Sequence, residues 1–236
     1  MADTELTQVM ESRANMYNLL ARAFINEVDK DFLTELKHMR FPQNTGNGDI
    51  DAAYLALYKY LRKTPESVLD DLAVDYARTF IGSGALDARA AYPFESVYTS
   101  EKGLLMQAAR DEVLAILRAE KLDGTLTWNE GEDHVGIELL FMREMAKRTN
   151  AALEAGDEDS AFSMLVTQRN FQHDHLLNWV FKWAVDVPKY AKLPFYTAFV
   201  DLTCAYLRED AALLIELVGE DETLAGAEAP EPEQEA

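Results

Sequence analysis

The segment NEGEDHVGIELLFM, residues 129–142, joins a polar head of three acids and a histidine to an apolar run. In that run Ile137 and Phe141 lie four residues apart, so they share one face of an α-helix. Asn129 and Glu132 are three residues apart, as in a capping box, where two side chains bond the free backbone groups of the first turn. The segment therefore predicts a helix that starts at Asn129.

Apolar residues keep this helical spacing through most of the chain, whereas no segment of useful length alternates as a strand does. Apolar stripes of this kind occupy residues 6–24, 54–61, 69–80, 137–155, 162–181 and 195–213. The 236 residues suit one large domain, and they show neither an internal repeat nor a linker. We expect an all-α fold, a single globular domain of eight to nine helices.

Punctuating residues set the expected boundaries of these helices. Thr64 and Pro65 form an N-cap and first-residue pair that opens one helix, and Gly82 ends it. A long mixed loop then runs to residue 98, after which Thr99 or Ser100 opens the next helix.

Charge separates the body of the chain from its end. The chain has 42 acids against 22 lysines and arginines, a formal net charge of −20. No lysine or arginine follows Arg208, whereas ten acids do. Residues 219–236 are rich in Ala, Pro and Glu, which predicts a disordered acidic tail behind a helical domain of residues 1–218. Such charge argues against nucleic acid or an anionic membrane as a partner and favours cationic ligands.

Cysteine use and hydropathy favour a reducing compartment. Cys204 is the only cysteine, so no intramolecular disulfide can form, and its apolar neighbours predict a buried, unreactive thiol. No run approaches the roughly 18 apolar residues of a membrane span, and residues 1–8 lack the basic and apolar regions of a secretory signal. We expect a cytoplasmic protein without stable membrane insertion.

A metal site in the polar head would need further ligands at defined spacing. Di-iron bundles pair Glu-x-x-His motifs on two helices, but Gly131 stands three residues before His134, and Asn170 three before His173. The zinc motif H-E-x-x-H is absent as well. We expect no metal and no cofactor.

Catalysis would need a nucleophile beside Asp133 and His134, which could form a general-base pair. The chain has no G-x-S-x-G motif, and GSG at residues 82–84 is too short for a phosphate loop, so we expect no enzyme. Helix capping explains Glu130, Glu132 and Asp133 as well as any functional role, because acids in a first turn complement the helix dipole. The histidine would then be neutral or held by a carboxylate.

A second cluster, YPFESVY at residues 92–98, carries three aromatic side chains on the predicted loop. Tyr92 precedes a proline, which favours extended backbone. The rings of Tyr92, Phe94 and Tyr98 either pin the loop to the core or line a groove for an extended or helical peptide. In such a groove Glu95 would add a carboxylate at the edge.

The two clusters, in this order, resemble the TorD/DmsD family of cytoplasmic chaperones for molybdoenzyme maturation. Three further segments are similar to family motifs: SRANMYNLLARAF at 12–24, DYARTFIG at 75–82 and FQHDHLLNW at 171–179. The resemblance spans roughly residues 10–210. It implies an all-α, TorD-like fold with a hinge that permits domain swapping, and hence a monomer or a domain-swapped homodimer.

The resemblance also implies a function. Family members bind the twin-arginine signal peptide, and the apo form, of a molybdenum-cofactor reductase such as a dimethyl sulfoxide or trimethylamine N-oxide reductase. They assist cofactor insertion and delay export. Carboxylates suit the two guanidinium groups of such a leader, and an aromatic groove suits its apolar segment. The peptide-binding positions expected here are Arg13, Tyr17, Tyr76, Phe80, Tyr92, Phe94, Glu95, Tyr98, Glu130, Asp133 and His134.

The chain departs from the family pattern at a few positions. Gly131 stands where the family usually has proline, and Tyr76 and Tyr98 stand where some members have tryptophan, which indicates a different partner preference. Two alternatives stay open. One is a nucleotide-binding or hydrolysing helical enzyme, since guanine-nucleotide binding has been proposed in the family. The other is a helical adaptor without a peptide groove, in which Tyr92, Phe94 and Tyr98 are all core residues.

Overall fold

A computed structural model of the chain describes residues 3–82, 89–124 and 131–220. Within these ranges the chain forms ten α-helices and no strand. They are α1 (Asp3–Ile25), α2 (Lys30–His38), α3 (Gly48–Lys63), α4 (Leu69–Tyr76), α5 (Glu95–Thr99), α6 (Ala108–Ala119), α7 (Val135–Glu154), α8 (Glu158–Phe171), α9 (Val180–Tyr190) and α10 (Pro194–Val218). A 3-10 turn, η1 (Glu66–Val68), and two π-helical turns, η2 (Ala77–Ile81) and η3 (Gln172–Leu177), adjoin them. The all-α expectation is confirmed, with more helices than the sequence predicted.

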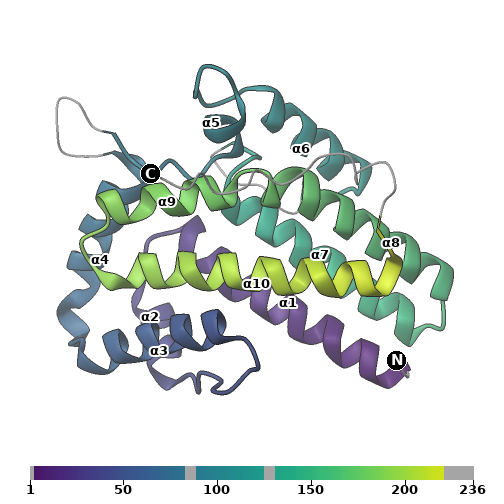
Figure 1. Cartoon of the computed structure of the whole chain (residues 1–236), viewed down its shortest axis with the longest axis horizontal. Helices are drawn as coiled ribbons and strands as arrows, with labels where there is room; N and C mark the ends of the chain where they lie inside the picture. The colour runs from purple at the N-terminus through teal and green to yellow at the C-terminus, as the bar shows by residue number, and fades with distance from the viewer. Residues whose placement is uncertain (1–2, 83–88, 125–130, 221–236) are drawn as a thin grey trace, which may run out of the picture.

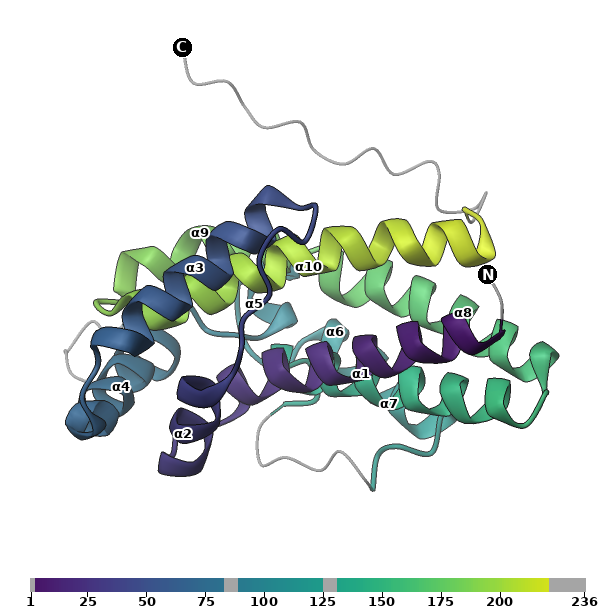
Figure 2. The same ribbon diagram turned by 90° about the horizontal axis from the view of Figure 1, so that it is seen from below.

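Long helices make up the body of the molecule. Helix α1 packs along α7, and α10 packs against α3, α8 and α9. Figures 1 and 2 show α3 and α10 side by side in both views. Helix α1 lies behind α10 in the view of Figure 1. No helix in the described part of the chain is long and apolar enough to cross a membrane.

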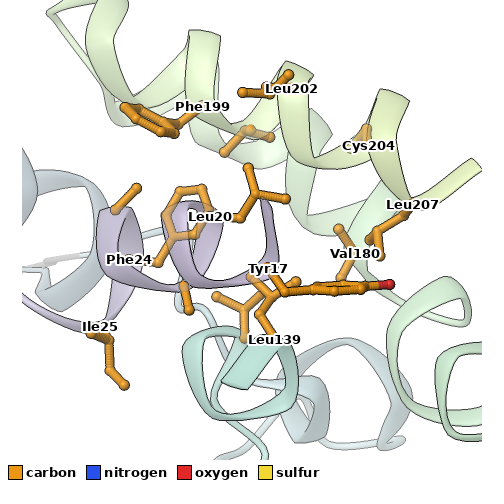
Figure 3. Packing of buried hydrophobic residues seen from close by; sticks show 14 of the residues in the cluster. Tyr17, Leu20, Phe24, Ile25, Leu139, Val180, Phe199, Leu202, Cys204 and Leu207 are labelled. Atoms are coloured by element: carbon orange, nitrogen blue, oxygen red, sulfur yellow. The ribbon is translucent and has the colours of Figure 1, made fainter. Parts of the chain in front are cut away.

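The apolar stripe predicted for the first helix faces the core. Tyr17, Leu20 and Phe24 of α1 are fully buried and point toward residues of α10, among them Phe199 and Leu202 (Figure 3). Burial of one such side chain stabilises the fold by roughly 1.5–3 kcal/mol. Helices α1 and α10, far apart in sequence, therefore share one core.

Cys204 lies at the edge of this core in the same view (Figure 3). Its thiol is buried, and this burial raises its pKa to about 12. The prediction of a buried cysteine is confirmed, and the raised pKa agrees with an unreactive thiol.

Several predicted helix starts are wrong. Thr64 ends α3 rather than opening the next helix, because its hydroxyl donates to the Tyr60 carbonyl at 2.6 Å. The helix expected at Thr99 or Ser100 begins at Ala108, since residues 95–99 form the separate short helix α5. Gly82, in contrast, ends its helix as predicted, with a left-handed φ of 82°.

The helix predicted to start at Asn129 begins at Val135 instead. Asn129 itself lies outside the described residues, but residues 131–134 are not helical. The acids ahead of the helix are therefore free for other contacts.

Candidate functional site

The two sequence clusters, residues 92–98 and 131–134, lie against each other. Phe94 and His134 form an isolated antiparallel bridge. The backbone N–H of Glu95 donates to the Asp133 carbonyl at 2.9 Å, and the N–H of Val135 donates to the Pro93 carbonyl at 2.9 Å. The loop before α5 is thereby fixed to the start of α7.

Asp133 caps α5, not its own helix. Its Oδ2 accepts the backbone N–H of Ser96 at 2.9 Å, and the side chain is fully buried. Burial raises the pKa of this carboxyl. Oδ1 has no hydrogen-bond donor within reach among the described residues. The prediction that Asp133 lies in the first turn of its own helix and caps it is therefore wrong.

His134 is the N-cap of α7. Its Nδ1 accepts the backbone N–H of Gly136 at 3.0 Å, which leaves the ring proton on Nε2. The ring packs edge-on against Phe94, with centroids 5.0 Å apart. Burial lowers the pKa of this imidazole to about 3, so the ring is neutral, as the sequence indicated.

Two more acids in this region are buried, Glu95 of the first cluster and Glu138 of α7. Glu95 accepts hydrogen bonds from His175 Nδ1 at 2.9 Å and from Asn178 Nδ2 at 2.7 Å. Glu138 accepts from Trp179 Nε1 at 3.1 Å. Burial, and then repulsion from Glu95 and Asp133, raises the pKa of Glu138 well above its ordinary value. Glu95 was expected at the edge of a groove, but the structure directs its side chain inward.

A pocket of about 730 Å³ opens beside the bridge. We call it the aromatic pocket; it is lined by Ile25, Asn26, Glu27, Asp29, Tyr76, Phe80, Ile81, Tyr92, Pro93, Phe94, Leu105 and His134. Five of the predicted positions, Tyr76, Phe80, Tyr92, Phe94 and His134, therefore share one wall. They come from α4, the π-turn η2, the loop and the start of α7, which the fold brings together.

The wall of the aromatic pocket is held rigidly. The Tyr76 hydroxyl donates to the Phe24 carbonyl at 2.7 Å, and the Tyr76 and Phe80 rings meet edge to face, with centroids 5.2 Å apart. Phe80 and Phe94 are buried, whereas Tyr92 is half-buried. These contacts restrict the Tyr76 and Phe80 rings, so a ligand in the pocket would cost them little side-chain entropy.

Arg13 and Tyr17 lie elsewhere, in the contact between α1 and α10. The Arg13 guanidinium donates to both oxygens of Asp210, at 2.6 and 2.9 Å, and the Tyr17 hydroxyl donates to Oδ2 at 2.5 Å. All three side chains are buried. Arg13 and Tyr17 hold the framework together and do not line the aromatic pocket.

Tyr98 and Glu130 complete the predicted set. The Tyr98 ring is half-buried and stacks on Trp179, with centroids 5.6 Å apart, and it does not line the aromatic pocket. Glu130 lies outside the described residues. Peptide contact by the predicted positions stays a prediction.

Sequence reasoning missed the acidic rim of the aromatic pocket, Glu27 and Asp29. Both are exposed on the link between α1 and α2. Asp29 caps α2 by accepting the Phe32 N–H at 2.7 Å and pairs with Arg22. Glu27 has no ion pair among the described residues. The signal in the sequence was two acids directly after a strongly apolar helix end.

Metal binding finds no support in this region. Within the described ranges, no group of three or more His, Cys, Asp or Glu side chains is placed to hold a metal ion. The buried acids instead bond backbone and ring N–H groups.

Comparisons with known proteins agree with the fold and the motifs. The family model described as nitrate reductase delta subunit matches residues 46–185. The chaperone protein TorD of Photobacterium profundum is 31% identical over 156 residues, 65% of this chain and 68% of that protein. The chaperone protein TorD of Vibrio cholerae serotype O1 (strain El Tor Inaba N16961) is 28% identical over 225 residues, 92% of this chain and 98% of that protein. The chain belongs to the TorD/DmsD family of redox-enzyme maturation chaperones and is not an enzyme.

Proposed function

We propose that this chaperone works in the cytoplasm and binds the twin-arginine signal peptide, and the apo form, of a molybdenum-cofactor reductase of the dimethyl sulfoxide or trimethylamine N-oxide reductase type. Binding assists cofactor insertion and delays export of the client. The TorD relatives support the chaperone class, and the aromatic pocket supports the signal peptide as ligand.

The observation that carries this proposal is the pairing of an aromatic wall with an acidic rim in one pocket. A twin-arginine leader has two guanidinium groups followed by an apolar helix. Glu27 offers an exposed carboxylate without an ion pair among the described residues, and carboxylates bind guanidinium in bidentate geometry. Asp29 is already engaged by Arg22, so a leader arginine would have to displace that pair.

An apolar shoulder extends the aromatic pocket. Ile81 and Leu105 line it and are 56% and 44% exposed, and Leu104 and Met106 beside them are exposed as well. Contiguous exposed apolar side chains mark interaction surfaces. This shoulder suits the apolar helix of the leader, and because exposed ion pairs contribute only about 0–1 kcal/mol, apolar contacts supply most of the affinity.

The buried members of the predicted set act indirectly in this proposal. Asp133 and His134 fix the loop that carries Tyr92 and Phe94, and Glu95 anchors the same loop from below. These are positioning roles. Whether the chaperone acts as a monomer or as a domain-swapped homodimer stays a prediction.

Calorimetric titration of the full chain with three synthetic leaders tests the proposal. The first has two adjacent arginines and the apolar segment, the second replaces both arginines by lysine, and the third lacks the apolar segment. We expect the intact leader to bind tightest and loss of the apolar segment to weaken binding at least about tenfold, equivalent to about 1.4 kcal/mol. Equal affinity for the first and third peptides would refute the pocket as the leader site.

The acidic rim has its own control. At low salt, Glu27→Gln should weaken binding of the intact leader by up to about fivefold, since one exposed pair contributes at most about 1 kcal/mol. Glu11→Gln, an exposed change on α1 away from the pocket lining, should leave the affinity unchanged.

A further inference from the structure

A second hollow, separate from the aromatic pocket, lies between α3 and the segment that precedes it. This α3 groove has a volume of about 480 Å³ and is lined in part by Arg40, Phe41, Tyr54, Leu55 and Tyr58. The Phe41 and Tyr54 rings lie 5.6 Å apart, and Leu55 and Tyr58 are 48% and 44% exposed. The groove is thus walled by aromatic and aliphatic side chains, of which Leu55 and Tyr58 face water and Tyr54 is buried.

Arg40 lines the α3 groove, and three more cations follow on α3 directly after its lining residue Tyr58, although the chain as a whole carries a net charge of −20. Arg40, Lys59, Arg62 and Lys63 are exposed and have no carboxylate within 4.0 Å among the described residues. Elsewhere most described arginines are paired, as Arg13, Arg22, Arg78, Arg110 and Arg143 are. The one acid that lines the groove, Asp51, accepts hydrogen bonds from Thr45.

The apolar and cationic groups form one surface. Leu55, Tyr58, Lys59 and Arg62 follow the i, i+3, i+4, i+7 spacing of a single helix face. The Arg62 guanidinium lies 5.9 Å from the Tyr58 ring centroid. A ligand complementary to this surface combines acidic with apolar groups. Its charge is therefore opposite to that of a twin-arginine leader. Aromatic-lined grooves suit proline-containing segments, whose extended form loses little entropy on binding.

The chain itself contains such a segment. Residues 227–236 read AEAPEPEQEA, in which Pro230 and Pro232 alternate with glutamates and no lysine or arginine occurs. We propose that this segment docks in cis into the α3 groove, with its prolines against the aromatic rings and its glutamates beside Arg40 and Arg62.

The segment can reach the groove from the end of α10. The chain leaves α10 at Gly219, whose carbonyl accepts from Arg169 at 2.7 Å. Helix α3 runs antiparallel to α10, because Asn47 bonds Glu209 at 2.9 Å and the Tyr60 ring packs 6.0 Å from Phe195. All of α3 therefore lies within about one α10 length of Gly219, about 37 Å at 1.5 Å per residue. Twelve extended residues, from Gly219 to Glu231, span about 40 Å.

Docking in cis would have a defined consequence. It covers the exposed Leu55 and Tyr58 and neutralises the surrounding cations. It also closes the α3 groove to any other acidic, proline-containing segment, while the aromatic pocket stays open to a cationic leader. The proposal is therefore independent of the leader site.

Paramagnetic relaxation measured on the full chain tests this proposal. A nitroxide is attached through Gln234→Cys in a Cys204→Ala background, and amide signals of residues 39–62 are recorded at low salt. We expect the nitroxide to reduce the intensity of these signals. In the spin-labelled double variant Arg40→Glu/Arg62→Glu the intensity should return. The matched double reversal Lys147→Glu/Lys182→Glu, exposed on α7 and α9, should keep the loss.

Three outcomes would overturn docking in cis. The first is full signal intensity in the spin-labelled chain, and the second is equal recovery in both double variants. The third is a loss that appears only when labelled and isotope-enriched chains are mixed, which would identify the tail of a second copy as occupant.

If Cys204→Ala does not fold, hydrogen exchange of residues 39–46 in the unmodified chain replaces the label, and Arg40→Glu/Arg62→Glu must speed this exchange relative to the control reversal.

Discussion

His134 shows how burial converts a titratable side chain into a structural one. The ring caps α7 through Nδ1 and is held neutral, with its pKa lowered to about 3 from the ordinary 6.5. The unfolded chain binds a proton on this ring near pH 6.5, whereas the folded chain does not. The contribution of His134 to stability is therefore present above pH 6.5 and is lost as the pH falls toward 3.

We expect His134→Asn to reduce the acid sensitivity of the fold. Asparagine is a good N-cap but does not titrate. Between pH 7.5 and pH 5 the free energy of unfolding of the wild type should fall by about 2 kcal/mol more than that of the variant. The reason is that pH 5 lies about 1.5 units below the ordinary pKa of the unfolded histidine, and each unit is equivalent to about 1.4 kcal/mol. Urea denaturation at the two pH values measures this. His38→Asn, a change at an exposed ring, is the control and should keep the wild-type fall; an equal fall in all three proteins would contradict the account.

At the scale of elements, the close approach of α1 to α7 depends on Gly136. A Cβ at this position would lie 2.9 Å from Cβ of Ile25, near the end of α1, and 3.1 Å from Nδ1 of His134. Ile25 also lines the aromatic pocket. One glycine thus sets both the packing of two helices and the position of a pocket wall.

Gly136→Ala should therefore lower the free energy of unfolding by about 1–3 kcal/mol, as overpacking does, and should also weaken leader binding because Ile25 is displaced. Chemical denaturation and calorimetry measure the two effects. Gly48→Ala, where an added Cβ meets nothing within 4 Å, is the control. Wild-type stability of Gly136→Ala would show that α1 can shift without cost.

The elements also show what the sequence could and could not predict. Period-3.6 stripes located the long helices, because each buries one face in a common core. The short helix α5 was missed and the start of α7 was misplaced, since both depend on tertiary bonds to Asp133 and Pro93. The π-turns η2 and η3, which carry Phe80 and His175, have no signature in the periodicity.

At the scale of the whole molecule, the ion pair of Arg13 and Asp210 joins the first helix to the last. Both side chains are buried, and Tyr17 and Gln172 complete the bonds of the carboxylate. The family resemblance implied a peptide-binding role for Arg13. A motif resemblance does not show whether an arginine pairs with a carboxylate inside the protein, here Asp210, or with a bound peptide.

Arg13→Ala should destabilise the fold by about 3–5 kcal/mol, because it leaves the Asp210 carboxylate buried and unpaired. Lys189→Ala, which removes an exposed ion pair with Asp186, should leave the free energy of unfolding close to that of the wild type. Thermal and urea denaturation of both variants decide the point. A cost below about 1 kcal/mol for Arg13→Ala, with leader binding lost, would instead assign Arg13 to the peptide.

The lining of the aromatic pocket includes some of the residues singled out from the sequence. Five aromatic or imidazole positions of the aromatic pocket lie in recognised motifs and were singled out, whereas Glu27 and Leu105 lie outside those motifs, and Ile81, inside the motif at 75–82, was not singled out. The residue types at these three positions do not mark them as binding residues, and the packing of α1, η2 and the residues before α6 brings them to the pocket.

The most direct test of the central claim compares two exposed apolar side chains by calorimetry with the intact twin-arginine leader. Ile81 lines the aromatic pocket and is 56% exposed, whereas Val185 on α9 is 66% exposed and does not line it. Ile81→Ser should weaken leader binding by roughly 10- to 100-fold, from about 1.5–3 kcal/mol of lost apolar burial, and Val185→Ser should bind like the wild type. Equal affinity of the two variants for the leader would contradict the aromatic pocket as its binding site.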